Sequence, residues 1–432
     1  MKTISIFNNK GGVGKTTLGY NVASTLGELG FKVLVIDLDP QCNFTIYSLH
    51  EDFIESMWQS EEPYIADFDK QRKLVGEPRF NSFIQQPRSI HFILKPVQDG
   101  TAGFESLIPP VNIAENFDLI PGRLSMYSYE NTISARWNNV LAQDPLSIRT
   151  VSAFRKISED YSSKYGYDFV FFDTSPNLGA MNKVAISTAD GFLIPCLPDL
   201  FSLYGVKNIG GAIAEWNKEF QRIDLVLDGA YSEMLPRAQA SLIGYLIYNA
   251  KKYSAKSKNK DKKDKWDLAI GHLKHAEQIP FAIETSIPKS ALTSIDSGLA
   301  SLPIGNMAIM HTHNTLAGMA QSYKMPMWKI PGYAKLEEED LRTVNGNRED
   351  YIVTNYKYKF FVIDMLARFG DEYRDRIRQL IDGLFEDCYS FIEAAKKSGV
   401  QDLDPATWLT DQWLKDLLYS YCEDSGKKFN TL

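Results

Sequence analysis

A glycine-rich segment near the N-terminus, KGGVGKTT at residues 10–17, constrains the fold of this chain more than any other feature. It follows a short β-rich run, TISIFN at residues 3–8. A helical pattern with apolar residues on one side comes next and stops at Gly30. Residues 32–39 (KVLVIDLD) are typical of a buried strand that ends in acidic residues. This order predicts a β-loop-α-β unit of a parallel sheet.

The composition of the glycine-rich turn predicts a site for the phosphates of ATP. Glycines let the backbone wrap around phosphate oxygens and turn its N–H groups inward. The helix that begins near Lys15 adds the positive end of its dipole. We expect the Lys15 ammonium to reach the β- and γ-phosphates and the Thr16 hydroxyl to bind Mg²⁺. The predicted nucleotide contacts in this segment are Asn9, Lys10, Gly11, Gly12, Val13, Gly14, Lys15, Thr16 and Thr17.

Two positions depart from the usual phosphate-binding loop. Asn9 stands where a glycine is usual, five positions before Gly14, and Lys10 adds a second lysine. The alternative interpretation is a glycine-rich turn that carries surface lysines. The flanking strand and helix, together with acidic residues farther along the chain, favour the phosphate site.

Acidic residues close two of the predicted strands. Asp37 and Asp39 end the second strand, and Asp173 ends the run YDFVFFD. The carboxyl ends of parallel strands lie beside the phosphate loop, where ligands of such sheets bind. A lone aspartate after an apolar run is more often a helix cap. Three of them behind a phosphate loop predict one carboxylate for the magnesium shell and one that positions the attacking water.

Strands and helices continue to alternate along the chain. Strands are predicted at 168–173 (DFVFFD), 191–196 (GFLIPC) and 242–249 (LIGYLIYN), and helices at about 147–164 and 205–220. This alternation predicts an α/β fold with a doubly wound, mostly parallel sheet.

Two regions do not follow that alternation. Residues 51–110 are rich in Pro, Gln and aromatic residues, and we interpret them as an irregular insertion on the rim of the sheet. Beyond residue 335, apolar residues recur at helical spacing in two stretches, which begin near Tyr373 and after Asp404. The predicted domains are an ATPase domain at 1–330, which contains the insertion, and an α-helical C-terminal appendage at 335–432.

Several features argue against other classes of protein. A run of about 18 apolar residues is absent, and the first residues, MKTISIF, do not resemble a signal peptide, so we expect a cytoplasmic protein without a membrane span. The four cysteines lie far apart and are expected to be reduced thiols in packed positions. The pairs His272/His275 and His311/His313 lack a third ligand nearby, which favours surface or core positions over a metal site.

These motifs resemble those of the ParA/MinD family of P-loop ATPases, most closely the ParA/Soj-type partitioning ATPases. KGGVGKTT resembles the deviant Walker A motif of that family, and IDLDPQCN (36–43) its second acidic motif with the first switch. DFVFFDTSPNLG (168–179) resembles its Walker B strand and second switch. Segments 117–130 and 189–206 are also similar to ParA proteins, so that the resemblance covers roughly residues 1–330 with gaps.

The resemblance implies a role for individual residues. ATP clamps two subunits of the family face to face, and the extra lysine, here Lys10, crosses to the partner's phosphates, where a second cation stabilises developing charge. Asp39 matches the water-positioning aspartate. Cys42 replaces the glycine usual in the first switch. The implied catalytic residues are Lys10, Lys15 and Asp39, and the implied metal residues are Thr16, Asp37 and Asp173. Asn249 and, in the loop Ile287-Pro288 followed by Ser297-Gly298, Pro288 are the implied adenine contacts.

Two functions are compatible with these residues. The first is a partitioning ATPase whose dimer binds DNA non-specifically and whose hydrolysis is triggered by a partner protein. The lysine-rich segment 251–265 supports it, although a solvated loop explains that segment equally well, and the net charge of −7 does not indicate a polyanion-binding protein. The second is a nucleotide switch in a defence or regulatory complex, with a partner docked on the insertion or the helical tail. Membrane positioning is disfavoured, because the last residues do not form a basic amphipathic helix.

Overall fold

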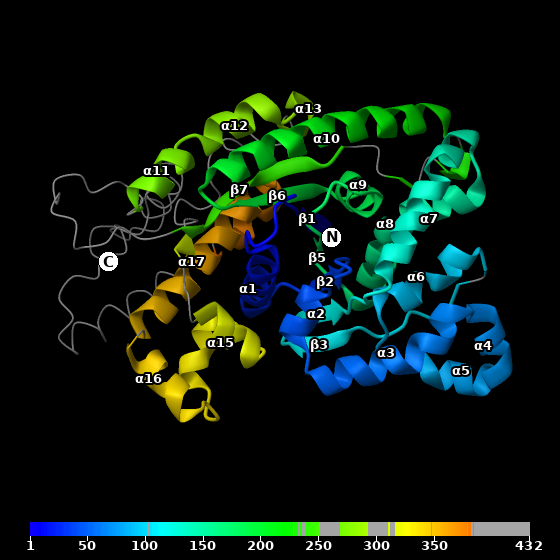
Figure 1. Ribbon diagram of the computed structural model, residues 1–432, viewed down its shortest axis with the longest axis horizontal. Coiled ribbons are helices and arrows are strands. Elements are labelled where there is room, and N and C mark those ends of the chain that lie inside the picture. Colours follow the sequence, from blue (N-terminus) through cyan, green and yellow to red (C-terminus); the bar gives the residue numbers. More distant parts are fainter. Residues whose placement is uncertain are drawn as a thin grey trace.

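A central eight-stranded sheet organises the computed structural model of the chain (Figure 1). The described residues are 1–227 except 102 and 105, 229–231, 234–235, 239–250, 268–292, 310–311, 316–346, 348–377, 379–381 and 383. The strands lie in the order β3-β4-β2-β5-β1-β6-β7-β8, and neighbours run parallel except β3 and β4. Their bounds are β1 (Lys2–Ile6), β2 (Val33–Asp37), β3 (Val111–Ala114), β4 (Phe117–Ile120), β5 (Phe169–Asp173), β6 (Gly191–Cys196), β7 (Ser241–Ala250) and β8 (Met310–His311).

Helices cover both faces of the sheet, which explains why the central strands are almost wholly apolar. In β2, Val33 and Val35 pack into the core beneath α1 and α17, whereas Leu34 and Ile36 pack into the core beneath α7, α8 and α9. Helices α10 and α12 extend the second layer along β6 and β7 (Figure 1). The helices of the first layer are α1 (Lys15–Glu28), α2 (Asn43–Ser48), α15 (Leu316–Ser322), α16 (Glu338–Gly346) and α17 (Arg348–Ala367). Those of the second are α7 (Met126–Arg136), α8 (Pro145–Tyr165), α9 (Ala180–Ser187), α10 (Leu200–Val226), α11 (Ile270–Ala276), α12 (Ile279–Ser286) and α13 (Lys289–Leu292).

The predicted fold class and its main elements are confirmed. The five predicted strands are β1, β2, β5, β6 and β7, and each lies within two residues of its expected bounds. The helix expected at 147–164 is α8, and the one expected at 205–220 is the longer α10. Helix α8 begins directly after Asp144, whose side chain caps the helix by accepting a hydrogen bond from the Ser147 amide at 2.8 Å. Aspartate is one of the residues preferred at this N-cap position.

The interpretation of residues 51–110 as irregular is wrong. They form α3 (Glu51–Ala66), α4 (Phe68–Val75), α5 (Glu77–Phe83) and α6 (Ile90–Asp99), followed by β3 at the sheet edge (Figure 1). The helices share a small core of their own in which aromatic rings pack together, with Tyr64 and Phe92 edge to face and Phe68 tilted against Phe92. Prolines inside α3 and α6 hide the helical pattern in the sequence.

The C-terminal helices are present, and α17 belongs to the main core. Tyr358, Phe361 and Leu366 on α17 are fully buried in the same cluster as Ile4 of β1 and Leu18 of α1. The domain boundary near residue 335 stays a prediction, and the structure packs α17 directly against α1. Most of the helix expected from Tyr373, and all of the second one, lie outside the described residues.

The cysteine prediction holds for the two cysteines that the structure describes, since Cys42 and Cys196 are free and buried. Cys388 and Cys422 lie outside that part of the chain. None of the helices in the described ranges combines the length and the apolar character that a membrane crossing requires.

Candidate nucleotide-binding site

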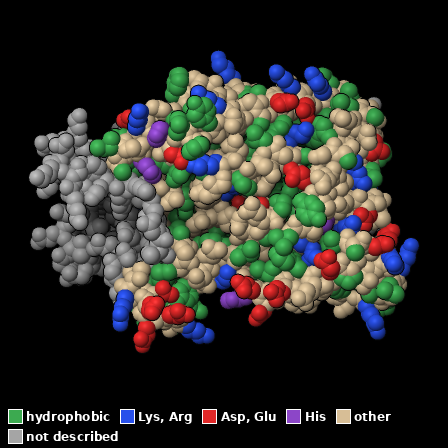
Figure 2. All heavy atoms as spheres, viewed as in Figure 1, with side chains coloured by type: hydrophobic (Ala, Val, Ile, Leu, Met, Phe, Trp, Pro, Cys, Tyr) green, Lys and Arg blue, Asp and Glu red, His purple; other side chains and the backbone are tan. Residues whose placement is uncertain are grey.

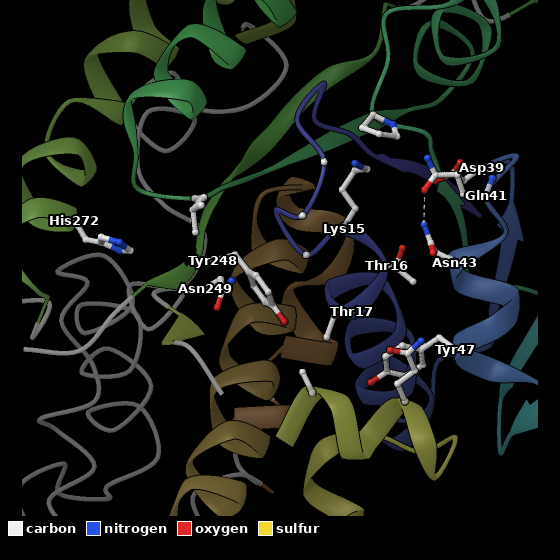
Figure 3. Close-up of a pocket in the computed structure, with 17 residues that line it drawn as sticks. Lys15, Thr16, Thr17, Asp39, Gln41, Asn43, Tyr47, Tyr248, Asn249 and His272 are labelled. Carbon is white, nitrogen blue, oxygen red and sulfur yellow. Dashed lines mark hydrogen bonds between the residues drawn. The ribbon is translucent and has the colours of Figure 1, made fainter. Parts of the chain in front are cut away.

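A cavity of about 740 Å³ opens at the carboxyl ends of the parallel strands, as sheets of this type predict. The glycine-rich segment after β1 forms one side, and the loop after β2 forms another. Of the predicted site residues, Gly11, Gly12, Gly14, Lys15, Thr16, Thr17, Asp39 and Asn249 line it. The other lining residues are Gln41, Asn43, Tyr47, Pro176, Leu197, Tyr248, His272, Ala317 and Gln321 (Figure 3).

The turn before α1 requires glycine for two reasons. Gly14 has a φ of +84°, a left-handed conformation that side chains disfavour. A Cβ atom at Gly14 would also lie 2.1 Å from Cε1 of Tyr248. The tyrosine ring therefore lies directly against the phosphate loop and fixes its path.

Lys15 is held in place by backbone oxygens of the same loop. Its Nζ donates to the carbonyl oxygens of Asn8 at 3.2 Å and of Lys10 at 3.4 Å. Burial lowers the pKa of Lys15, and the nearby carboxylates of Asp173 and Asp39 partly oppose this shift. A buried ammonium that faces the cavity is suited to bind phosphate oxygens, which would replace the solvation it has lost.

Thr16 and Asp173 form the part of the site that fits Mg²⁺. The Thr16 hydroxyl donates to Oδ2 of Asp173 at 3.0 Å. Oδ1 of Asp173 is buried without a hydrogen-bond partner among the described residues. Burial, reinforced by the charge of Asp37, raises the pKa of Asp173 well above its usual value. An unpaired buried carboxylate oxygen beside a hydroxyl is an oxygen-only set of the kind that Mg²⁺ prefers.

The described residues contain no group of three His, Cys, Asp or Glu side chains that could hold a metal alone. Mg²⁺ does not require such a group, since it usually binds one or two carboxylates together with substrate phosphates. The Thr16–Asp173 pair is thus compatible with a magnesium ion that arrives with its nucleotide.

Asp39 and Asp37 lie in different environments in the folded chain. Asp39 faces the cavity, and burial raises its pKa while the charge of Lys15 opposes the shift. Asp37 does not line the cavity. Its Oδ2 accepts from the Thr45 amide at 2.9 Å and from the Thr45 hydroxyl at 2.6 Å, and its Oδ1 accepts from the Asp39 amide at 3.2 Å. Burial raises the pKa of Asp37 to about 7. Asp37 therefore orients the loop that carries Asp39, and its role as a metal ligand stays a prediction.

Cys42, which follows Asp39 by three residues, adopts a backbone conformation that favours glycine. Its φ is +54°, in the left-handed region. A non-glycine residue in this conformation implies local backbone strain in the loop that carries Asp39.

Three of the predicted nucleotide contacts, Asn9, Lys10 and Val13, do not line the cavity. The Lys10 ammonium forms an ion pair with Asp199 and lies 5.6 Å from the centre of the Phe201 ring. Burial acts to raise the pKa of Asp199, but hydrogen bonds from Lys10 and the Ser202 amide hold it below its usual value. Val13 is fully buried.

The far end of the cavity contains residues that the sequence did not reveal. Asn249, Tyr248 and His272 line it (Figure 3), whereas Pro288 does not, and the adenine contact of Asn249 stays a prediction. Ser297 and Gly298 lie outside the described residues. Ala317 and Gln321 come from α15, for which the sequence offered no motif. Gln41 and Asn43 could have been inferred from their places next to Asp39.

A protein-family model matches the first half of the chain. The model of the AAA_31 family, described as an AAA domain, matches residues 1–225. The chain belongs to this family. The AAA_31 match spans the phosphate loop, Asp39 and the strand that ends at Asp173. Together with the relatives below, it confirms the resemblance to ParA/MinD-type P-loop ATPases.

Individual relatives are distant. The chromosome-partitioning ATPase Soj of Thermus thermophilus is 27% identical over 215 residues, which are 50% of this chain and 62% of Soj. An uncharacterized protein of Methanocaldococcus jannaschii is 29% identical over 207 residues, 48% of this chain and 63% of that protein. The chain thus spans slightly less than two thirds of either relative. Among solved structures, protein DIP2308 of Corynebacterium diphtheriae is 27% identical, covering 58% of this chain and 80% of that one, with a TM-score of 0.48.

Proposed function

We propose that this chain binds MgATP in the cavity and hydrolyses it to ADP and phosphate. The observation that carries the proposal is the convergence of Lys15, Thr16 and Asp39 on one cavity, with Asp173 bonded to Thr16. Thr17 and the amides of the glycine-rich loop would bind the phosphates, and Asn249 the adenine edge. Mg²⁺ held beside Thr16 and Asp173 would neutralise charge on the β- and γ-phosphates.

In the proposed reaction, Asp39 positions a water molecule for in-line attack on the γ-phosphorus. A bond forms between the water oxygen and phosphorus as the bond to the bridging oxygen breaks. The raised pKa of the partly buried Asp39 favours it as acceptor of the water proton. Lys15 stabilises negative charge on the leaving oxygens.

We further propose that the active form is a nucleotide-sandwich homodimer. Large apolar side chains lie exposed at the start of α10, beside Lys10: Leu200 is 50% exposed, Phe201 73% and Tyr204 58%. Such a patch beside a ligand site is typical of an interaction surface. For Lys10 to reach the partner's phosphates, its ion pair with Asp199 must open. A cytoplasmic location and a partner protein that stimulates hydrolysis are parts of this proposal.

The proposed cellular role is partitioning or cargo positioning through non-specific DNA binding, as the name of the Thermus relative suggests. The lysine-rich segment 251–265, the best candidate for phosphate contacts, lies outside the described residues. On the face shown in Figure 2, basic and acidic side chains of the described part are interspersed. DNA binding would therefore depend on that segment more than on this face.

A specific observation also favours a switch controlled through the insertion. Trp58 on α3 donates from Nε1 to the Gly122 carbonyl at 3.1 Å, and the Gly122 amide donates to the Thr45 hydroxyl at 2.7 Å. The Thr45 hydroxyl in turn donates to Asp37, which orients Asp39. A partner bound to the insertion would thus act on the loop that carries Asp39, here called the hydrolytic loop, as the second hypothesis requires.

The test of the first proposal compares MgATP binding and turnover of the wild-type chain with two variants. Lys15→Ala should abolish turnover and most binding, while Lys73→Ala, at an exposed position on α4, should change neither. ATPase activity retained in Lys15→Ala would refute the assignment of the phosphate site.

Binding to random-sequence DNA at low and high salt separates the two roles. ATP-dependent binding that weakens as salt rises would support partitioning. An active ATPase without such binding would support the switch instead.

A further inference from the structure

The first-switch helix α2 connects the hydrolytic loop to the C-terminal part of the chain. It begins at Asn43, four residues after Asp39, and has only six residues. So short a helix is unstable by itself and takes its position from its contacts. At its start, Asp37 accepts hydrogen bonds from the amide and hydroxyl of Thr45.

The other end of α2 is held by Lys324, which follows α15. Lys324 Nζ donates to the Ile46 carbonyl oxygen at 2.5 Å. Ile46 lies in the last turn of α2, where carbonyl oxygens have no partner within the helix and where the helix dipole favours a cation. Asp37 at the N-terminus and Lys324 at the C-terminus therefore match the dipole of α2 at both ends.

The backbone of Lys324 is fixed to the phosphate-loop helix. Its carbonyl oxygen accepts a hydrogen bond from the Tyr20 hydroxyl at 3.0 Å, and Tyr20 lies on α1. The Tyr20 ring also contacts the Tyr47 ring of α2, with centroids 4.4 Å apart. Lys324 has a φ of +53°, which an L-residue adopts only when its surroundings determine it. One residue thus bridges the helix that starts at Lys15 and the helix that follows Asp39.

We propose that Lys324 is a positioning residue for ATP hydrolysis, which sets the distance between the Asp39 loop and the phosphate loop by clamping α2 against α1. Neighbouring Gln321 supports this placement, because it lines both the nucleotide cavity and a second hollow that Ile46 and Lys324 also line. The inference rests on the proposed ATPase function. It makes residues 316–324 part of the catalytic unit and gives a partner on the C-terminal region a route to the hydrolytic loop.

The test uses the full chain and compares Lys324→Met with Lys324→Arg. Loss of the clamp should lower kcat by about 10- to 100-fold, the effect of a displacement of around 1 Å in a catalytic group, and change KM for ATP less than about threefold. Arginine can still donate to the Ile46 carbonyl and should restore kcat to within about threefold. The control is Lys329→Met, which removes the lysine of an exposed ion pair with Glu28 in the same region and should behave as wild type.

A second measurement does not depend on turnover. Backbone amides of α2 should exchange with deuterium at least about tenfold faster in Lys324→Met than in wild type or in Lys329→Met. Unchanged exchange of the α2 amides in Lys324→Met would overturn the positioning role. So would a rise in KM as large as the fall in kcat, accompanied by a general loss of stability of that variant. If the wild-type chain hydrolyses no ATP while exchange responds as expected, the clamp stands and the ATPase proposal fails.

Discussion

The contact between Gly14 and Tyr248 leads to a prediction whose size follows from the structure. In Gly14→Ala, a non-glycine residue must adopt a φ of +84°, which costs about 1–2 kcal/mol. The new Cβ would also lie 2.1 Å and 2.3 Å from two Tyr248 ring carbons, and such overpacking costs about 1–3 kcal/mol more. We expect the free energy of unfolding to fall by about 2–5 kcal/mol.

Gly12→Ala is the matched control. Gly12 lies in the same loop with a φ of +74°, but a Cβ atom there would meet nothing within 4 Å. Its cost should be the strain alone, about 1–2 kcal/mol. The assay is urea unfolding of the nucleotide-free chain, followed by fluorescence and circular dichroism.

A double-mutant cycle isolates the steric part. In a Tyr248→Leu background, which removes the ring, Gly14→Ala should cost no more than Gly12→Ala. Equal costs of the two alanine substitutions in the wild-type background would refute the argument, because they would show that the Tyr248 ring does not restrict the loop.

Three further predictions concern catalysis, packing and pH. Asp39→Ala should slow hydrolysis by about 10²- to 10⁴-fold yet still form a dimer with ATP, measured by light scattering; a monomer at saturating ATP would contradict the sandwich. Arg368→Met should destabilise the chain by about 3–5 kcal/mol in urea, because it removes the guanidinium that pairs with the fully buried Asp364 carboxylate. Breaking the exposed pair Lys156–Asp160 by Lys156→Met should cost less than about 1 kcal/mol, and similar costs for the two variants would argue against the importance of the buried pair. Burial lowers the pKa of His91 to about 4, so as pH falls the imidazole takes up a proton in the unfolded chain before it does so in the folded chain. Relative to His91→Gln, the wild-type chain should therefore lose about 2 kcal/mol of its free energy of unfolding between pH 7.5 and pH 5. A difference in stability between the two proteins that does not change with pH would exclude this effect.

The phosphate site could be predicted from the sequence because its residues are consecutive. KGGVGKTT contains the loop, the lysine and the hydroxyl in eight residues, and the conformation of Gly14 follows from local sterics. Asp39 and Asp173 can be predicted for a related reason, since Asp39 follows β2 by two residues, Asp173 ends β5, and parallel strands place their ends together.

Other parts of the site depend on contacts between distant segments. Tyr248 reaches Gly14 from β7, and Gln321 reaches the cavity from α15, about 300 residues after the phosphate loop. Neither position has a pattern that distinguishes it from ordinary packed or polar residues. The helices of the insertion cannot be predicted from the sequence pattern because they include Pro63 and Pro96 and are stabilised by an aromatic core that only the folded chain assembles.

The predicted role of Asp37 shows how a motif and its geometry can differ. Its place beside Asp39 predicts a metal contact, whereas in the folded chain Asp37 does not line the cavity and accepts hydrogen bonds from the Thr45 and Asp39 amides and the Thr45 hydroxyl. Lys10 is similar, because the sequence marks it as unusual while only the folded chain reveals its pair with Asp199.

A crystal structure of the chain with Mg²⁺ and a non-hydrolysable ATP analogue tests the central claim most directly. We predict that the triphosphate lies against the backbone amides of residues 11–17, with Lys15 on its terminal phosphates and the metal beside Thr16 and Asp173. A triphosphate bound elsewhere, or a loop whose amides face away from it, would contradict the account.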